Sequence, residues 1–514
     1  MVDEPGLTVF SSETVPSPLK TDTSKTNSGL ESLSGRSSSV YSNVLPQHKE
    51  YLRASLELMA FLGISAGYYY GTLGDPKWYE FKSAGESLEA RFITGDAYLL
   101  DNNAWDTNVG HIAAGTGYYL LSRGNDLSLI ESMLLTLGAS TTWEMFGELQ
   151  DEFSINDAIM TPFGGFAIGE VMYQFGEFFQ HSSHSIPNQV LGILFGPSTA
   201  IHRWLDNDRP APPAHVDKFG FTTDAWHRFR LYAGGGASYS GDTHKYSAES
   251  EMGFDFQVVT AEKYGKPGEA STFYKDGVFN EMALDAVLSG SDVVDFRFFS
   301  KTAFLGYYQQ NILKEDASQN LEGNSLFVGL GSALEYYSHL FSEMREEDKQ
   351  TVCDLIGPSL VADFYHQGLH LRVGADIYPT FSMVQPAARE FYNQNRNLAG
   401  VKSVYRAEDY YYALGMGTVG RMEMEYGPFG LEGHIRYHYF NSIEGLDRYQ
   451  SIVVNDIPLE DERLWLQLTF LYDLPIENLK LGLNADKIYR WSDIDDHSYD
   501  MNESRFFARL VFEF

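Results

Sequence analysis

The sequence predicts a membrane protein of the α+β class, in which apolar N-terminal helices are combined with an antiparallel outer-membrane β-barrel-like sheet of roughly 10–12 strands. Three observations predict it. Residues 49–215 contain apolar segments of helical length, residues 225–514 alternate polar and apolar side chains, and the last strand ends in phenylalanine. Residues 1–48 are rich in Ser, Thr and Pro and are expected to form a disordered arm.

The composition excludes one class of partner and two kinds of site. The 514 residues contain 37 Lys and Arg against 70 Asp and Glu, which gives a formal net charge of -33. Nucleic acid is therefore not an expected partner, because phosphate binding needs a basic surface. Cys353 is the single cysteine, so neither a disulfide framework nor a thiolate metal site is available.

The helical part is apolar on most faces. Its first segment is "YLRASLELMAFLGISAGYYYG", and Gly or Pro marks the boundaries of the later segments. Small residues such as Gly164, Gly165 and Gly169 allow helices to approach closely in an apolar setting. Helices that are apolar nearly all round are not stable in water, so residues 49–215 are expected to be membrane-associated.

The C-terminal part changes to a period of two. Runs such as "HRFRLYAGGGASYSG" and "RLWLQLTFLYDL" alternate in character, and turn residues such as "YGPFG" separate them. A soluble β-sandwich has the same alternation. The length of the runs, and the Tyr and Phe residues near their ends, favour membrane strands.

The last strand, "RFFARLVFEF", carries a further signal. Phe506, Leu510, Phe512 and Phe514 lie on one apolar face. This face resembles the terminal signal of bacterial outer-membrane barrels, which implies the barrel assembly machinery as a partner during insertion. The start of the chain has no secretory signal. We therefore expect that a signal peptide has been removed and that the protein resides in the outer membrane of a Gram-negative bacterium.

A block of polar residues interrupts the apolar helices. Its members are Asn108, His111, Trp143, Glu144, Glu148, Ser154, Asn156, Asp157, Glu170 and Glu177. The pattern Gly-His, Tyr-Tyr, Trp-Glu with a second Glu, Ser-x-Asn-Asp, Thr-Pro-x-Gly-Gly and Gly-Glu resembles a family of bacterial envelope proteins known only as a domain of unknown function. The resemblance implies helices followed by a barrel-like half, and it implies no activity.

The catalytic candidates in this block are His111, Glu144, Glu148, Asp157 and Glu170. Glu144 and Glu148 share a helical face, as metal-binding carboxylates can. However, no His lies three or four residues from either acid, and the Glu-x-x-His motif of di-iron proteins is absent. No metal and no cofactor are therefore expected. A Gly-x-Ser-x-Gly elbow for serine hydrolysis is absent too.

A structural role for the polar block needs no chemistry. Ser154 is placed to cap a helix whose third residue is Asp157. Glu170 and Glu177 fall on one helical face, as a polar stripe that would meet a neighbouring helix, the barrel lumen or a water-filled groove. Trp143 suits a membrane interface.

These observations together predict an integral outer-membrane protein with a structural or lipid-interacting role. Membrane lipid is an expected partner, and so is a second copy of the chain, because one small barrel is too narrow to bury several apolar helices. A ring that encloses lipid would satisfy both. A porin-like channel is the first alternative. An intramembrane lipid-modifying enzyme that uses the His/Glu block is the second.

Overall fold

A computed structural model describes residues 40–41, 48–73, 80–208, 210–241, 245–314, 320–340 and 347–514. The arm predicted over residues 1–48 lies almost wholly outside the described residues. The described helices of the N-terminal part run from Tyr51 to Leu205, and the barrel strands run from Trp226 to Glu513.

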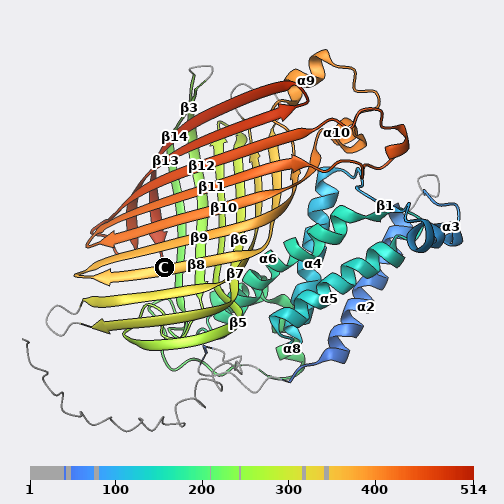
Figure 1. The fold of residues 1–514 in the computed structure, drawn as a ribbon. Coiled ribbons are helices and arrows are strands. Elements are labelled where there is room, and N and C mark those ends of the chain that lie inside the picture. The colour runs from blue at the N-terminus through green and yellow to red at the C-terminus, as the bar shows by residue number, and fades with distance from the viewer. Residues whose placement is uncertain are drawn as a thin grey trace, which may run out of the picture. The chain divides into compact units, whose positions relative to one another are not determined.

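The C-terminal half is a closed barrel of 12 antiparallel strands, which confirms the predicted fold class (Figure 1). Neighbouring strands along the chain pair with each other, and β14 closes the barrel on β3. The strands are β3 (Trp226–Ser240), β4 (Tyr246–Val259), β5 (Gly268–Ser289), β6 (Asp292–Lys314), β7 (Leu321–His339), β8 (Asp348–His366), β9 (Leu369–Val384), β10 (Tyr411–Tyr426), β11 (Phe429–Ser442), β12 (Leu459–Asp473), β13 (Leu479–Ile494) and β14 (His497–Glu513).

Alternation along each strand separates an apolar outside from a charged inside. On β14, Phe506 and Leu510 are 61% and 51% exposed, whereas Arg505 and Arg509 between them are buried. The strands are 14 residues (β4) to 23 residues (β6) long. Since about 9–11 residues cross a bilayer as a tilted strand, each strand is long enough to span the membrane.

The two ends of the barrel differ in their connections. Gln367 and Gly368 alone join β8 to β9, and the turn between β10 and β11 is equally short. At the opposite end, residues 385–410 contain α9 (Arg389–Asn395) and α10 (Ser403–Glu408), and residues 443–458 contain η4 (Gln450–Ile452). We call these the turn end and the loop end. In outer-membrane barrels the longer connections lie outside the cell.

The N-terminal half folds into helices, which we call the helical block. It consists of α2 (Tyr51–Tyr68), η1 (Tyr69–Leu73), α3 (Ala84–Glu89), η2 (Ala90–Thr94), β1 (Tyr98–Leu99), α4 (Trp105–Gly124), α5 (Leu129–Thr142), η3 (Trp143–Gly147), β2 (Phe153–Ser154), α6 (Ile155–Gln180), α7 (Ile186–Phe195) and α8 (Pro197–Leu205). Among the helices within the described ranges, none combines the length and the apolar character needed to cross a membrane.

The helical block packs against the outer face of the barrel wall, and Figure 1 shows it beside the strands. Ser300 on β6 donates a hydrogen bond to the carbonyl oxygen of Ala167 on α6 at 2.9 Å. Lys301, the next residue of β6, points the other way and pairs with Asp376 among the inward-facing side chains. Because neighbouring residues of a strand face opposite sides, α6 lies outside the barrel.

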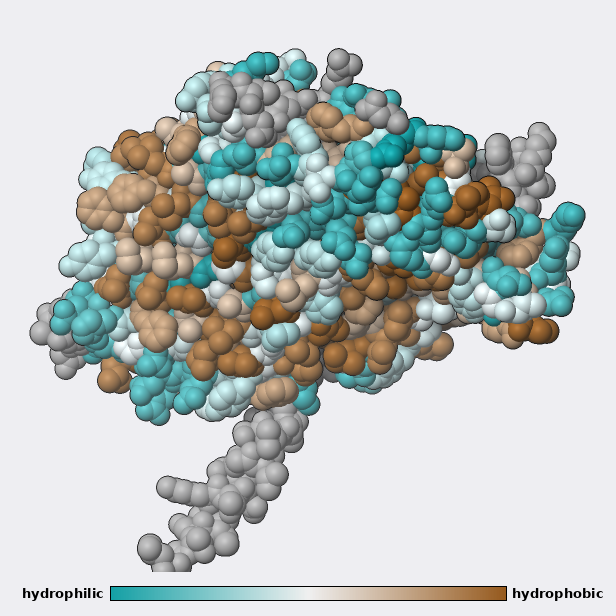
Figure 2. Space-filling model, turned by 45° about the horizontal axis from the view of Figure 1, so that its top comes forward, coloured by the Kyte–Doolittle hydropathy of each residue, from teal (hydrophilic) through white to brown (hydrophobic). Residues whose placement is uncertain are grey.

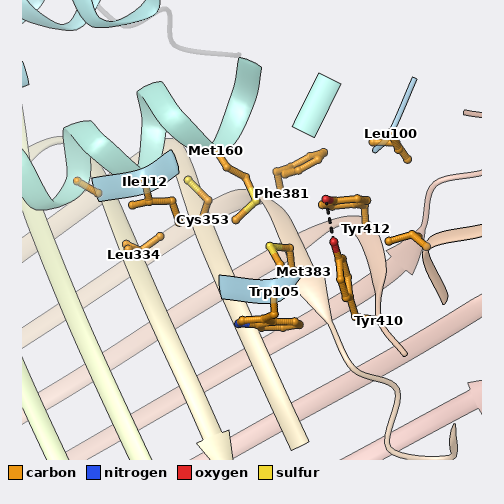
Figure 3. Packing of buried hydrophobic residues seen from close by; sticks show 12 residues of the cluster. Leu100, Trp105, Ile112, Met160, Leu334, Cys353, Phe381, Met383, Tyr410 and Tyr412 are labelled. Atoms are coloured by element: carbon orange, nitrogen blue, oxygen red, sulfur yellow. Dashed lines mark hydrogen bonds between the residues drawn. The ribbon is translucent and has the colours of Figure 1, made fainter. Parts of the chain in front are cut away.

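An apolar cluster seals this contact (Figure 3). Ile112 and Met160 of the helical block pack on Leu334, Cys353 and Phe381, which are outward-facing residues of three neighbouring strands. Four strand pairs shift register along the same part of the wall, near Gly277, Phe304, Gly331 and Asp354. Such bulges bend strands, so the wall is reshaped where the helices meet it.

The two central helices cross at unusually close range. A Cβ atom added to Gly165 on α6 would lie 2.3 Å from the carbonyl carbon of Gly115 on α4. The glycines therefore allow backbone-to-backbone packing that no larger residue permits. α6 is 26 residues long, and at 1.5 Å per residue it extends about 39 Å along the wall. It starts beside the loop end and finishes at the turn end, where Phe178 packs against Phe229.

Candidate functional site

Three members of the predicted polar block meet at the loop end of the helical block. His111 on α4, Glu144 on η3 and Asp157 on α6 present one ligand atom each, and these three atoms lie within 4.8 Å of one another. We call these three residues the His–Glu–Asp cluster. The spacing of residues around Glu144 does not predict this cluster, because its histidine comes from a different helix.

A change of helix type places Glu144. α5 ends at Thr142 and continues as a π-helical turn, η3, and such turns are frequent at functional sites. The Glu144 side chain is 1% exposed, and its Oε2 accepts a hydrogen bond from the backbone N–H of Ser154 at 3.2 Å. Arg91 donates to the backbone carbonyl oxygens of Glu144 and Asp151, at 3.2 and 2.8 Å, and so fixes this turn through its main chain.

The start of α6 places Asp157. Ser154 is the N-cap residue, and its Oγ accepts the backbone N–H of Asp157 at 3.2 Å. In a complete capping box the Asp157 carboxylate would accept the Ser154 backbone N–H. That N–H goes to Glu144 instead, so Ser154 links the two buried carboxylates.

Amide side chains connect the cluster to the barrel. Asn156 donates to Asn108 at 3.3 Å, and Asn108 donates to the Tyr410 hydroxyl group at 2.9 Å. Tyr412, on β10, donates to Asp101 at 3.3 Å. Figure 3 shows Tyr410 and Tyr412 side by side, joined by a hydrogen bond. The cluster is therefore held in place by the outward face of the barrel wall.

The charges of the cluster are poorly compensated. Of the Lys and Arg side chains in the described part of the chain, none lies within salt-bridge distance of the Glu144 or Asp157 carboxylate; the only ion pair is His111 to Asp157 at 3.5 Å. Burial, reinforced by neighbouring acids, raises the pKa of Glu144 and of Asp157 well above the usual range. Burial also raises the pKa of Glu148 to about 7 and lowers the pKa of His111.

Two other acids of the block, Glu170 and Glu177, each have an arginine partner. The Glu170 carboxylate accepts hydrogen bonds from the Tyr119 hydroxyl at 2.7 Å and from the Gly277 backbone N–H at 3.1 Å, and it pairs with Arg123 at 3.1 Å. Glu177 pairs with Arg203 at 2.9 Å. The predicted polar stripe thus separates into two ion pairs, one against the barrel wall and one at the turn end.

Trp143 contacts another aromatic residue, because its ring lies edge-on to Tyr69 with the centroids 6.2 Å apart. Sequence reasoning did not select Arg91, Asp101, Arg123, Tyr410 or Tyr412. Tyr410 ends the long 385–410 connection and Tyr412 lies just after it. Nothing in the local sequence marks these tyrosines as partners of residues some 300 positions away.

Ion pairs fill the barrel lumen. Examples are Arg297 with Asp295 at 2.9 Å, Arg490 with Asp348 at 3.0 Å and Arg228 with Glu423 at 2.7 Å. Two cavities among the inward-facing side chains have volumes of about 90 and 50 Å³. A barrel of 12 strands is intermediate between eight-stranded barrels filled by side chains and 16–18-stranded barrels with an aqueous channel.

The fold is a helical block joined to a closed, antiparallel 12-stranded barrel. Residues 97–198 match the family model described as "Domain of unknown function (DUF3943)", which confirms the resemblance carried by the polar block. This segment contains the His–Glu–Asp cluster together with Glu170 and Glu177. The search of curated proteins found no match.

The chain is similar to several solved structures, among them the following three. The outer-membrane channel DcaP of Acinetobacter baumannii is 15% identical, with 58% of this chain and 99% of that chain covered and a TM-score of 0.20. OpdQ of Pseudomonas aeruginosa is 10% identical, with coverages of 57% and 100% and a TM-score of 0.19. The translocator domain of the autotransporter NalP from Neisseria meningitidis is 8% identical, with coverages of 56% and 88% and a TM-score of 0.21.

Proposed function

We propose that the protein is an integral outer-membrane protein of a Gram-negative bacterium with a structural or lipid-interacting role. In this proposal the barrel anchors the protein in the membrane, and the helical block on its outer wall makes the functional contacts. The observation that carries the proposal is the position of the block: its inner side is sealed against the wall by Ile112 and Met160, while its outer side is apolar and open.

The outer side of the block is rich in large apolar side chains. On α2, Leu52 and Ile64 are 73% and 74% exposed, and on α5, Leu134 is 61% exposed. Further exposed apolar residues of the block are Leu56, Met59, Leu137, Val190, Ile193, Leu194, Ile201, Trp204 and Leu205. Figure 2 shows hydrophobic residues gathered in broad patches on the face in view. Exposed apolar patches of this kind mark interaction surfaces.

Lipid acyl chains are the proposed occupant of this surface. The outward faces of the neighbouring strands carry the same kind of exposed apolar residue, for example Leu326, Val328 and Phe364. Helices that lie on a lipid-facing wall meet the same lipid. Self-association is a second arrangement that this surface allows, and copies would then meet through α2 and α5, as in a ring that encloses lipid.

A porin-like channel fits the barrel fold equally well, and a lipid-modifying enzyme is the second alternative. A channel needs a continuous aqueous path, and ion pairs between inward-facing side chains, such as Arg297 with Asp295 and Arg490 with Asp348, occupy part of the lumen. A lipid-modifying enzyme finds support in the buried His–Glu–Asp cluster, since such groups can serve as general acids and bases. Insertion by the barrel assembly machinery, through the outward face of β14, is part of the same proposal.

The experiment that tests the proposal is native mass spectrometry of the protein after gentle extraction from outer membranes, combined with conductance in planar bilayers. We expect bound lipid, with or without further copies of the chain, and no steady conductance. A lipid-free monomer would contradict the lipid-interacting role. Stable, ion-selective currents would favour the channel instead.

A further inference from the structure

We propose that His111, Glu144 and Asp157 bind one divalent transition-metal ion at the loop end of the helical block, with Zn²⁺ as the best fit. Their three ligand atoms lie within 4.8 Å of one another. Atoms bound at about 2.0–2.2 Å from a common ion lie roughly 3–4 Å apart. Small side-chain rotations would therefore close the site without moving the helices.

The pairing of the other buried acids provides the first independent support. Glu170 and Glu177 in the same block each have an arginine partner, at 3.1 and 2.9 Å. Glu144 and Asp157 are equally buried, at 1% exposure each, and the described arginines do not pair with their carboxylates. Buried carboxylates need a compensating charge. A divalent cation would supply it.

The hydrogen bonds of Glu144 provide the second independent support for the metal site. Ser154 occupies its Oε2, whereas its Oε1 has no hydrogen-bond partner in the described part of the chain. Arg91, the nearby cation, is engaged with the carbonyl oxygens of Glu144, Glu148 and Asp151. The second oxygen of this carboxylate is thus left available within the cluster.

The kind of donor indicates the kind of ion. Imidazole nitrogen suits Zn²⁺ and similar transition metals, whereas Mg²⁺ and Ca²⁺ prefer oxygen alone. Asn156 and Ser154 donate to the two oxygens of Asp157, at 3.3 and 2.9 Å, and would orient it as a ligand. The His111 side chain is 20% exposed, so an ion can enter from that side and water can complete its coordination.

The test measures uptake of ZnCl₂ by the purified, detergent-solubilised full-length protein after treatment with a chelator. We expect one tightly bound Zn²⁺ per chain by calorimetry and elemental analysis, with at least a tenfold weaker affinity in His111→Gln and in Asp157→Asn. The matched control is His184→Gln, which removes an exposed imidazole outside the cluster and should keep wild-type affinity. MgCl₂ is the control ion and should not compete.

Two results would overturn the proposal. One is a wild-type protein that retains no Zn²⁺ after dialysis, and the other is a His111→Gln protein that binds as tightly as the wild type. Folding of each variant is checked by circular dichroism. If the variants do not fold, modification of the wild type by diethylpyrocarbonate decides: Zn²⁺ should protect His111 but not His184, and equal modification of both would refute the site.

Discussion

Glu170 on α6 accepts a hydrogen bond from the backbone N–H of Gly277 on β5 at 3.1 Å, across the boundary between the helical block and the barrel. Gly277 lies at a shift in the β5–β6 register, where the strand has a free N–H to give. Arg123, which pairs with Glu170 and lies 3.9 Å from the centre of the Tyr173 ring, completes this junction. The bulge in the wall and the buried acid on the helix are therefore two parts of one contact.

Replacing Glu170 should therefore lower the free energy of unfolding strongly. In Glu170→Gln, the buried Arg123 loses its main partner, and removing one member of a buried ion pair costs about 3–5 kcal/mol of unfolding free energy. Urea unfolding followed by tryptophan fluorescence measures this loss. The control is Glu477→Gln, whose pair with Lys218 is exposed to solvent and should contribute little to stability. Equal effects of the two substitutions would mean that Glu170 does not stabilise the contact between the helical block and the barrel.

The close crossing of α4 and α6 makes a second prediction. Gly165→Ala should destabilise the protein, because the new Cβ would lie 2.3 Å from a Gly115 backbone atom. Gly138→Ala on α5 is the matched control, since nothing lies within 4 Å of a Cβ there. It should be neutral or stabilising by up to about 1 kcal/mol, because alanine favours the helix. Thermal melting of both variants tests the difference, and a Gly165→Ala protein as stable as Gly138→Ala would refute the tight crossing.

A charged residue on the outward face of β14 should impair insertion of the protein into a bilayer. Phe506 is 61% exposed on the outside of the barrel, and an Arg on a lipid face costs about 2–4 kcal/mol at the middle of the bilayer. Phe506→Arg should reduce the fraction of protein that inserts into bilayers, as read from the shift of the folded band on unheated gels. Asp500→Arg, near the loop end of the same strand, should insert normally. Normal insertion of both would argue against a lipid-facing β14.

Asp126, between α4 and α5, should give the stability a measurable pH dependence. Burial raises the pKa of Asp126 to about 6, above its ordinary value of 3.8. The folded state therefore holds this proton more tightly than the unfolded state. The stabilisation is fully present below pH 3.8 and is lost as the pH rises through 6.

Asp126→Asn should flatten that dependence and leave the fold intact, because Asn tolerates the positive φ of 59° at this position. The measurement is the free energy of unfolding at pH 4 and pH 7 for both proteins. An unchanged difference between the two pH values in the variant would show that Asp126 is not the group responsible.

The sequence predicted the barrel because each strand carries its own evidence. On β14 the alternation of Phe506 and Leu510 with Arg505 and Arg509 indicates which side faces outward. This indication does not depend on the rest of the chain. The period of two is a local property, and so the strands could be placed without knowledge of their partners.

The site could be predicted only in part, because its contacts are between distant residues. His111 and Glu144 were both candidates, but their meeting depends on how α4 and α5 pack. The position of the helical block on the outer wall could not be predicted from the sequence either. An outward residue such as Ser300 has the same sequence signature whether it faces lipid or α6.

Accessibility of spin labels on the helical block tests the central claim most directly. Single cysteines at Ile64 and Leu134 would carry the labels, with His48→Cys as the exposed polar control; the native Cys353 is buried and should stay unlabelled. In bilayers, we predict that oxygen dissolved in the lipid relaxes the labels at positions 64 and 134, while a water-soluble nickel complex relaxes only the label at position 48. Relaxation of positions 64 and 134 by the nickel complex would contradict the account.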